Sequence, residues 1–122
     1  MAKVLIVDDS RFQRNQIIRS LEGEDYDIIS AENGKIGLEL FEKNNPDCVL
    51  SDLNMPVMDG YELLERIRSQ NKKIPVIIIT SDTQELTNKK CVALGAFGIL
   101  TKPYKKEDIL NVIKSALSQM GK

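Results

Sequence analysis

Charged and hydroxyl side chains follow four short apolar runs of the sequence, and their chemical types suit one another. They are Asp8-Asp9 after Val4–Val7, Asp52 after Cys48–Leu50, Thr80-Ser81 after Val76–Ile79, and Lys102-Pro103 after Phe97–Leu100. If the runs are strands of one parallel sheet, these groups meet beyond the carboxyl ends of the strands. Carboxylates that crowd together repel each other, and a hard divalent cation relieves that repulsion. The sequence therefore predicts a cation site beside a lysine.

The ligand types favour Mg²⁺, which prefers oxygen ligands in octahedral geometry and keeps several of its water molecules. We expect Asp9 and Asp52 to bind the cation directly, and Asp8 to bind it directly or through water. The backbone carbonyl of Asn54 would complete the share of ligands that the protein supplies. An isolated Asp8 would as readily be a turn residue, but three acidic residues near one lysine favour a functional site.

Two further side chains suit the transfer of a phosphoryl group to an aspartate. Lys102 supplies a positive charge for a phosphoryl oxygen, and Thr80 supplies a hydroxyl group that can follow it. Asp52 is the candidate acceptor, because catalysis of such a transfer consists mostly of positioning and charge neutralisation. The competing interpretation of Thr80 is an ordinary hydroxyl at the end of a strand.

The segments that carry these residues alternate between strand-like and helix-like patterns. There is one more apolar run, Ile28–Ala31, which is the second in chain order. The first, third and fourth of the five runs are nearly continuous aliphatic stretches. Such composition is typical of strands covered on both faces. We expect five helices between and after these runs. The first three begin at Ser10, at Asn33 or Gly34, and at Asp59. The fourth runs from about Asp82 to Leu94 and ends at Gly95, and the fifth follows Pro103. The alternation predicts an α/β fold in which helices cover both faces of a parallel sheet.

Composition limits the classes of function. The chain has 122 residues, which fits a single domain over 1–122. A net charge of -1 argues against direct binding of nucleic acid or insertion into a membrane, and no apolar run approaches the ~20 residues of a membrane helix. Cys48 and Cys91 read as reduced, buried thiols of a cytoplasmic protein. Histidine is absent, so any phosphohistidine must come from another protein.

Four blocks together resemble a response-regulator receiver domain of the CheY-like family, which serves two-component and chemotaxis signalling. The blocks are LIVDDS (5–10), SDLNMPVMDG (51–60), IIITS (77–81) and TKPY (101–104). They stand in the family's order and at its separations, and the resemblance covers essentially the whole chain. It implies a flavodoxin-like (βα)5 fold, a doubly wound five-stranded parallel sheet with strand order 2-1-3-4-5.

The resemblance also implies a role for each residue of the predicted site. The roles are phosphoacceptor for Asp52, acidic metal pair for Asp8 and Asp9, carbonyl ligand for Asn54, switch hydroxyl for Thr80, and phosphoryl partner for Lys102. A separate histidine kinase would donate the phosphoryl group in the presence of Mg²⁺. The domain would catalyse its own phosphorylation and slow hydrolysis without otherwise being an enzyme. The phosphorylated state would bind a downstream protein target through the face of the fourth helix, fifth strand and fifth helix.

One position departs from the family pattern. Three residues before Lys102, where the family commonly has an aromatic residue that moves with the switch hydroxyl, this chain has Ile99. Tyr104 is better interpreted as a packing residue than as a substitute. Asn54 and Asp82 occupy the two positions that tune hydrolysis in the family, and we expect their polar groups to orient the attacking water. The resemblance implies a cis peptide bond before Pro103.

Several residues near the site favour structural roles. Asp59 with Gly60 is typical of a turn and helix cap, and Met55 and Met58 suit the cover of apolar surface. The lysine pairs 89–90 and 105–106 are typical of solvated helix faces.

Three alternatives to a stand-alone phosphorylation switch stay open. The chain could be a receiver domain cut from a DNA-binding regulator, although the DDSRF segment favours the stand-alone kind. It could be a Mg²⁺-dependent phosphohydrolase with Asp52 as nucleophile, but such enzymes usually carry a second aspartate where Asn54 stands. It could also be a binding module that works without phosphorylation. We expect a monomer, with dimerisation on phosphorylation as an option.

Overall fold

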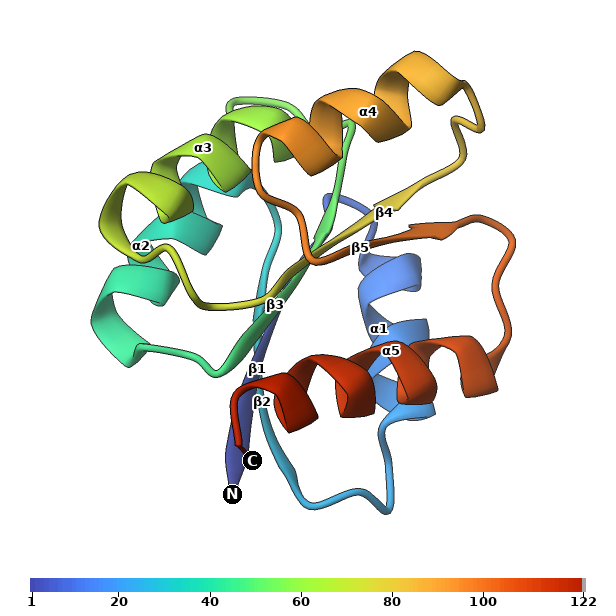
Figure 1. The fold of residues 1–122 in the computed structure, drawn as a ribbon. Helices are drawn as coiled ribbons and strands as arrows, with labels where there is room; N and C mark the ends of the chain where they lie inside the picture. The colour runs from blue at the N-terminus through green and yellow to red at the C-terminus, as the bar shows by residue number, and fades with distance from the viewer. Residues whose placement is uncertain (122) are drawn as a thin grey trace.

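Five strands and five helices alternate along the chain in the computed structural model, which describes residues 1–121 (Figure 1). Lys122, the last residue of the expected domain 1–122, lies outside the described residues. The strands are β1 (Ala2–Val7), β2 (Tyr26–Ala31), β3 (Cys48–Asp52), β4 (Val76–Thr80) and β5 (Gly98–Thr101). The helices are α1 (Arg11–Ser20), α2 (Gly34–Asn44), α3 (Gly60–Gln70), α4 (Glu85–Ala93) and α5 (Lys106–Gln119).

The strands form one parallel sheet in the order β2-β1-β3-β4-β5, which confirms the predicted fold. Val7 pairs with Ser51 and Asp52 pairs with Ile79, so the carboxyl ends of the three inner strands lie at one edge of the sheet. Strands β3 and β4 are buried throughout, whereas β2 and β5 form the edges of the sheet and are partly exposed. The aliphatic runs of the inner strands and the mixed composition of the outer two explain this difference.

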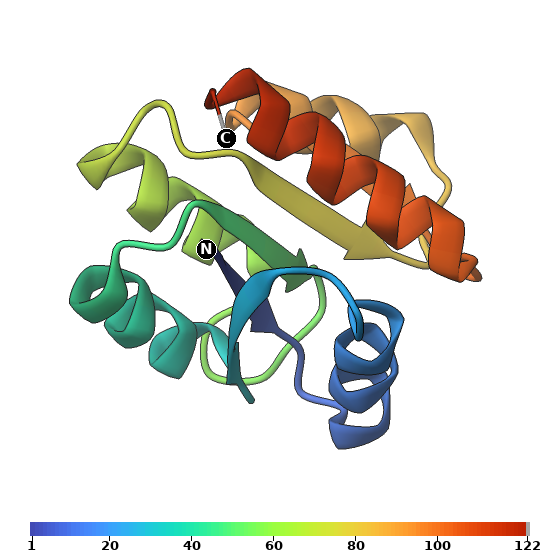
Figure 2. The same ribbon diagram turned by 90° about the horizontal axis from the view of Figure 1, so that it is seen from below.

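Helices cover both faces of the sheet and enclose two hydrophobic clusters. Helices α1 and α5 lie on one face, and α2, α3 and α4 lie on the other (Figures 1 and 2). Ile17 of α1 packs with Ile109 and Ile113 of α5 in the first cluster, and Leu64 of α3 belongs to the second together with Cys91 of α4. Packing in the two clusters holds the sheet in place, and the polar residues lie at its carboxyl edge.

Local signals at the helix ends were largely predictable. The caps of the first three helices are confirmed: the Ser10 hydroxyl accepts from the Gln13 N–H (3.2 Å), the Asn33 side chain from Ile36 (2.9 Å) and Asp59 from Glu62 (2.9 Å). Gly95 has a φ of +99°, the left-handed conformation expected after α4.

Several boundaries differ from the prediction: β1 and β2 each begin two residues before the apolar runs, and two other differences have a local cause. Helix α4 begins at Glu85 rather than near Asp82, because the Asp82 carboxylate accepts a hydrogen bond from the backbone N–H of Gln84 and thus lies outside the helix. Strand β5 begins at Gly98, one residue later than expected, since its pairing with β4 starts at the Ile77–Gly98 pair.

Most of the residues assigned structural roles take them. Cys48 and Cys91 are free, buried thiols, and Met55 and Met58 belong to a hydrophobic cluster. Lys90 is exposed as expected, but its ammonium nitrogen also lies 4.0 Å from the centre of the Tyr61 ring, a contact that the sequence did not indicate. Over residues 1–121, no helix combines the length and the apolar character that a membrane span needs.

Candidate functional site

Three carboxylates meet at the carboxyl edge of the sheet. Asp8 directly follows β1, Asp9 is its neighbour, and Asp52 is the last residue of β3, the strand next to β1. Each of the three offers one carboxylate oxygen, and these oxygens all lie within 4.8 Å of one another. Asp8 and Asp52 are buried, whereas Asp9 is exposed. The predicted acidic cluster therefore exists as a group with one open side.

The Asp52 carboxylate is buried beside the ammonium group of Lys102. Its side chain is held by a hydrogen bond from the backbone N–H of Leu53 (2.8 Å), and the Lys102 nitrogen lies 3.6 Å from the same oxygen. Removal from water raises the pKa of Asp52, and the nearby lysine lowers it by a smaller amount. The lysine thus offsets part of the cost of burying this carboxylate.

Asp8 provides the clearest sign that the cluster fits a cation. One of its oxygens accepts a hydrogen bond from the backbone N–H of Ser10 (2.9 Å). The other oxygen is buried and has no hydrogen-bond partner among residues 1–121. Burial raises the pKa of Asp8, and the neighbouring charges of Asp52 and Asp9 raise it further. A buried, unpaired oxygen on one member of a group of three carboxylates is an arrangement that a hard divalent cation stabilises.

The loop after Asp52 is tightly turned. Val57 has a φ of +72°, and the Met58 N–H donates to the carbonyl oxygen of Pro56 (2.8 Å), a rare and strained three-residue turn. A side chain at Gly60 would clash, because its Cβ would lie 2.5 Å from the Asp52 carbonyl oxygen. The loop is therefore pressed against the end of β3. Asn54 is exposed in this loop, and the role of its carbonyl as a ligand stays a prediction.

Thr80 and Lys102 reach the site from the next two strands. Thr80 ends β4 and is fully buried, and its hydroxyl oxygen accepts a hydrogen bond from the Asp82 N–H (3.0 Å). Lys102 follows β5, and its backbone N–H donates to the Thr80 carbonyl oxygen (2.8 Å). The Lys102–Pro103 peptide bond is cis, as the resemblance implied. The structure thus brings Thr80 and Lys102 to the same edge as the carboxylates.

The remaining predicted residues lie around this edge. Ile99 pairs with Ile78 in the sheet, is partly exposed and packs against the hydrophobic cluster that contains α3 and α4. Tyr104 packs on the opposite cluster, and its hydroxyl group lies 3.4 Å from the Gln13 side chain, which supports the packing interpretation. Asp82 lies before α4 and uses both carboxylate oxygens in hydrogen bonds.

Sequence reasoning missed a surface cavity of about 560 Å³ between α1 and the β5–α5 segment. Gln13 and Gln16 line it from α1, and Lys102 and Tyr104 line it from the other side. The helical spacing of the two glutamines was the available signal, but nothing in the sequence placed α1 opposite Tyr104. Lys102 therefore borders a solvent-accessible cavity as well as Asp52.

Comparison with known proteins decides the family. A sequence model described as the response regulator receiver domain matches residues 4–114. The chain belongs to this family. It is 39% identical over 120 residues to the chemotaxis protein CheY of Halobacterium salinarum and 35% identical over 120 residues to the protein PilH of Pseudomonas aeruginosa. Both alignments cover 97% of this chain and 99% of the relative.

A solved structure agrees with these relatives. The chemotaxis protein CheY4 of Vibrio cholerae superimposes with a TM-score of 0.90 at 36% identity, over 96% of this chain and 99% of that one. The family is one of signalling switches in two-component systems. This receiver domain therefore combines a family fold with an acidic cluster, a buried hydroxyl group and a lysine at one edge of its sheet.

Proposed function

We propose that this receiver domain is a switch that is activated by phosphorylation of Asp52. The observation that carries the proposal is the surroundings of its carboxylate, which lies within 3.6 Å of the Lys102 ammonium group and beside the carboxylates of Asp8 and Asp9. A carboxylate that is buried, paired with one cation and open on one side can act as a nucleophile towards phosphorus.

The transfer makes one bond and breaks another. A carboxylate oxygen of Asp52 attacks the phosphorus of a phosphohistidine on a separate kinase, the P–N bond breaks, and an acyl phosphate forms. Lys102 pairs with a phosphoryl oxygen, and Thr80 reorients its hydroxyl group towards another. Attack of water on the phosphorus later releases inorganic phosphate and restores the Asp52 carboxylate. The domain thus catalyses its own phosphorylation and dephosphorylation but turns over no other substrate.

The donor set fits Mg²⁺ as the resident cation. Asp8, Asp9 and Asp52 would hold it, with the Asn54 carbonyl as a fourth protein ligand, and the unpaired Asp8 oxygen supports this assignment. When bound, the cation supplies positive charge that offsets the crowded carboxylates and the phosphoryl oxygens.

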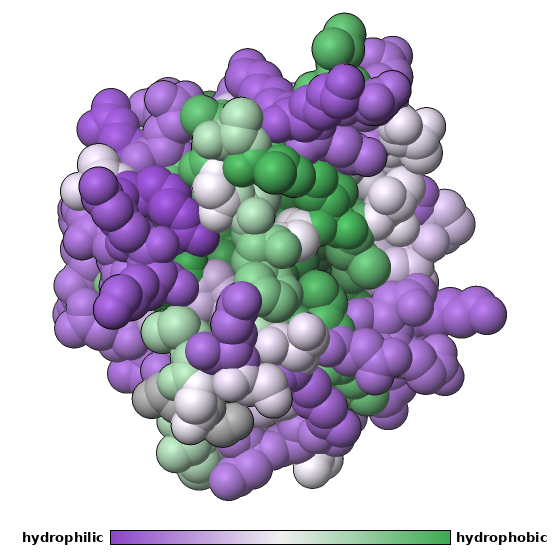
Figure 3. Space-filling view, viewed as in Figure 1, coloured by the Kyte–Doolittle hydropathy of each residue, from purple (hydrophilic) through white to green (hydrophobic). Residues whose placement is uncertain are grey.

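The output surface is the face formed by α4, β5 and α5. Figure 3 shows an apolar area on this face that is surrounded by hydrophilic side chains. Strand β5 is an edge strand of the sheet and all four of its residues are partly exposed, and Val92 on α4 is 64% exposed. A contiguous apolar area with a polar rim suits a protein partner, and the net charge of -1 does not suit nucleic acid or an anionic membrane.

We propose a stand-alone regulator in the cytoplasm by likeness to CheY and PilH, which the chain matches over 99% of their lengths. The transcriptional regulatory protein PhoP of Bacillus subtilis, of which the chain covers 48%, represents the alternative of a receiver domain attached to a further domain. We expect a monomer in the unphosphorylated state, and dimerisation on phosphorylation is a further option for the same face. Binding of a protein target by this chain alone would favour the stand-alone regulator over a receiver domain that acts through an attached domain.

Asp82 and Asn54 would tune the lifetime of the phosphorylated state by orienting the attacking water. Two hydrogen bonds, from the Thr87 hydroxyl group and the Gln84 N–H, occupy the Asp82 carboxylate and hold its pKa below the usual range, which keeps it ionised. If this role is correct, the lifetime of phospho-Asp52 changes in Asp82→Ala, and an unchanged lifetime would remove Asp82 from it.

Phosphorylation by acetyl phosphate tests the proposal. Wild type with Mg²⁺ should take up one phosphoryl group per chain, measured by intact-protein mass spectrometry, and Asp52→Asn should take up none. Asp9→Asn should react more slowly, while Asp59→Asn, an acidic cap on α3 in the same loop, is the matched control and should react as wild type does. Continuous turnover of acetyl phosphate with no stable adduct would instead favour a phosphohydrolase.

A further inference from the structure

Helix α4 is poorly anchored through its own side chains. Leu86 and Val92 are 77% and 64% exposed, and Cys91 is the buried residue of this helix. On the inner side, the amide oxygen of Asn88 is buried and has no hydrogen-bond partner within residues 1–121. A buried acceptor without a donor destabilises the conformation that contains it. The position of α4 is therefore held by contacts at its two ends.

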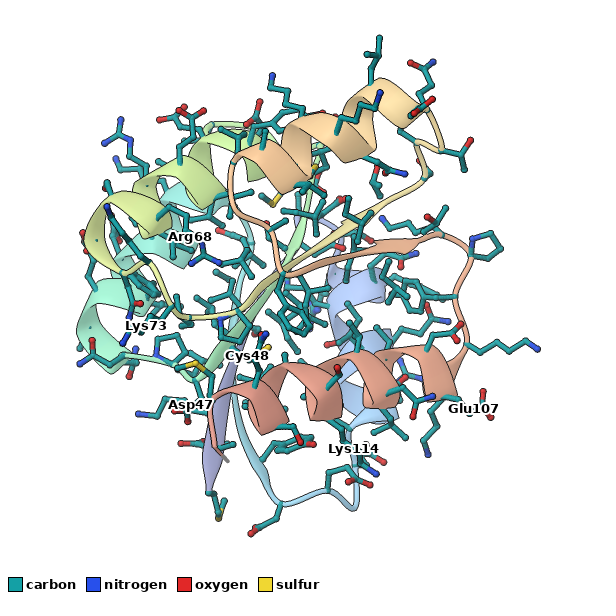
Figure 4. The ribbon with its side chains drawn as sticks, in the orientation of Figure 1. Asp47, Cys48, Arg68, Lys73, Glu107 and Lys114 are labelled. Carbon is teal, nitrogen blue, oxygen red and sulfur yellow. The ribbon has the colours of Figure 1, made fainter. Side chains whose placement is uncertain are left out.

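The carboxyl-terminal end of α4 is tied to α3. Arg68, labelled in Figure 4, donates from two nitrogens to the carbonyl oxygen of Gly95 (2.9 and 2.7 Å) just beyond α4. The Lys90 ammonium group lies over the ring of Tyr61 at 4.0 Å. Because both contacts join the last turns of α4 to a well-packed helix, this end is the fixed one.

The amino-terminal end depends on Asp82. Gln84 occupies the cap position of α4, but its side chain makes no capping hydrogen bond. The Asp82 carboxylate takes over this task, because one oxygen accepts from the Gln84 N–H (2.8 Å) and the other from the Thr87 hydroxyl group (2.7 Å). A single half-buried carboxylate thus holds the first turn of α4 in place.

The same residue is linked to the site. The Asp82 N–H donates to the hydroxyl oxygen of Thr80 (3.0 Å), which is fully buried at the end of β4. If the Thr80 hydroxyl group turns towards a phosphoryl group on Asp52, the Asp82 N–H loses its acceptor. Asp82 therefore connects the end of β4 to the first turn of α4, through one hydrogen bond to Thr80 and two at its own carboxylate.

We propose that Asp82 is a positioning residue that transmits the state of Thr80 to α4, so that loss of the Thr80–Asp82 hydrogen bond releases the first turn of the helix. The inference rests on the proposed function, because it takes phosphorylation of Asp52 as the event that moves Thr80. Asp82 would connect the site to α4 in a chain that has no aromatic ring at position 99. Ile99 itself packs against the cluster that contains Cys91 and Leu94. Helix α4 then shifts about its fixed carboxyl-terminal end, which changes the position of Leu86 beside the output face.

Hydrogen exchange of the full chain tests this route. Beryllofluoride with Mg²⁺ serves as a phosphoryl mimic that cannot be hydrolysed, so any effect of Asp82 on phosphate lifetime does not enter. In wild type, the mimic should speed amide exchange in residues 85–93. In Asp82→Ala, exchange of these residues should already be about fivefold faster without the mimic, the effect of a lost helix cap, and should respond little to its addition.

Two further variants make the result specific. Thr87→Val keeps the shape of the side chain but removes the hydroxyl group, and should behave as Asp82→Ala does in residues 85–93. Asp59→Ala removes the equivalent cap of α3, and should speed exchange in residues 60–70 while leaving the response of α4 to the mimic unchanged. A full wild-type response of α4 in both Asp82→Ala and Thr87→Val would overturn the inference.

Binding of the mimic is recorded separately by ¹⁹F NMR. If wild type binds beryllofluoride and α4 responds equally in all variants, the inference is wrong and the switch function stands. If wild type does not bind the mimic in the presence of Mg²⁺, the proposed function fails and the inference fails with it.

Discussion

Helices α3 and α4 are both preceded by an aspartate that holds the start of the helix, but they are packed differently. Each follows an aspartate whose carboxylate accepts a hydrogen bond from a backbone N–H of the first turn or just before it, Asp59 for α3 and Asp82 for α4. Helix α3 buries Leu63, Leu64 and Ile67 completely, whereas the large apolar residues of α4 are exposed. An aspartate therefore holds the start of both helices, but packing fixes α3 and does not fix α4.

The difference shows which part of the molecule is scaffold and which can respond. A fully buried Leu or Ile contributes about 1.5–3 kcal/mol, so three of them secure α3 and with it the tight loop after Asp52. Helix α4 has no such group of buried leucines, and hydrogen bonds at its ends determine its position. A site that must stay rigid thus lies next to α3, and the helix linked to Thr80 is the one that can move.

The largest expected difference is in stability. Leu64→Ala in α3 should lower the free energy of unfolding by about 3 kcal/mol, because it leaves a cavity in a fully buried position. Leu86→Ala in α4 should change it by less than about 0.5 kcal/mol, since that side chain is 77% exposed. Urea unfolding of both variants measures the contrast, and similar losses would show that α4 is as much a part of the core as α3.

Arg68 joins the two helices, and its removal should have the next largest effect. Arg68→Ala leaves the Gly95 carbonyl oxygen without its two donors and should cost about 2 kcal/mol in urea unfolding, with the greatest loss of exchange protection in α4. Arg66→Ala is the matched control, because it removes only an exposed ion pair with Glu62 on the same helix. If the two variants are equally stable, Arg68 does not anchor α4.

The two cysteines report the local stability of the two regions. Burial raises the pKa of both thiols, that of Cys48 to about 12, so each reacts at pH 8 only when the structure around it opens. Cys91 requires opening of α4, whereas Cys48 lies in a central strand and requires global unfolding. In single-cysteine variants, Cys91 should therefore react with a thiol reagent roughly tenfold faster or more. Equal rates would contradict local opening of α4.

The pH dependence of stability follows from the same pKa. The stabilisation that comes from keeping the Cys48 thiol neutral is complete below its ordinary pKa of 9.0 and is lost as the pH rises through about 12. The free energy of unfolding should thus fall over this range, and the fall should be smaller in Cys48→Ala. A parallel pH profile for the variant would show that Cys48 does not titrate in this way.

The smallest expected effects are those of the two caps on global stability. Asp59→Ala should cost about 1 kcal/mol, because α3 unfolds together with the core. Asp82→Ala should cost less in urea unfolding, since α4 can open without the rest of the molecule. Comparison of the two unfolding midpoints checks this order, and a larger loss for Asp82→Ala would contradict it.

The sheet and most of the site could be predicted because their signals are local. Continuous aliphatic runs marked the inner strands, and an acidic residue at the end of a strand such as Asp52 is unusual enough to indicate a function. The order of the strands came from the resemblance to the receiver family, since many orders satisfy the same alternation of helix and strand. The caps Ser10, Asn33 and Asp59 were identified by residue type alone.

The features that were missed depend on contacts distant in sequence. The positive φ of Val57 could not be predicted, because β-branched residues rarely adopt it. The Lys90–Tyr61 contact and the hydrogen bonds from Arg68 to Gly95 have no sequence signature. The start of α4 was misplaced because an aspartate suits both the first turn of a helix and the segment before it, and only the hydrogen bonds of Asp82 to Gln84 and Thr87 place it before the helix.

Residue-resolved amide NMR of the full chain, before and after phosphorylation by acetyl phosphate with Mg²⁺, tests most directly whether chemistry at Asp52 changes α4 and spares α3. We expect the amide resonances of residues 85–93 to move on phosphorylation, those within 64–70 to stay in place, and neither set to move in Asp52→Asn. Equal shifts in the two helices of wild type, or the same shifts in Asp52→Asn, would contradict a switch in which α4 reads the state of Asp52.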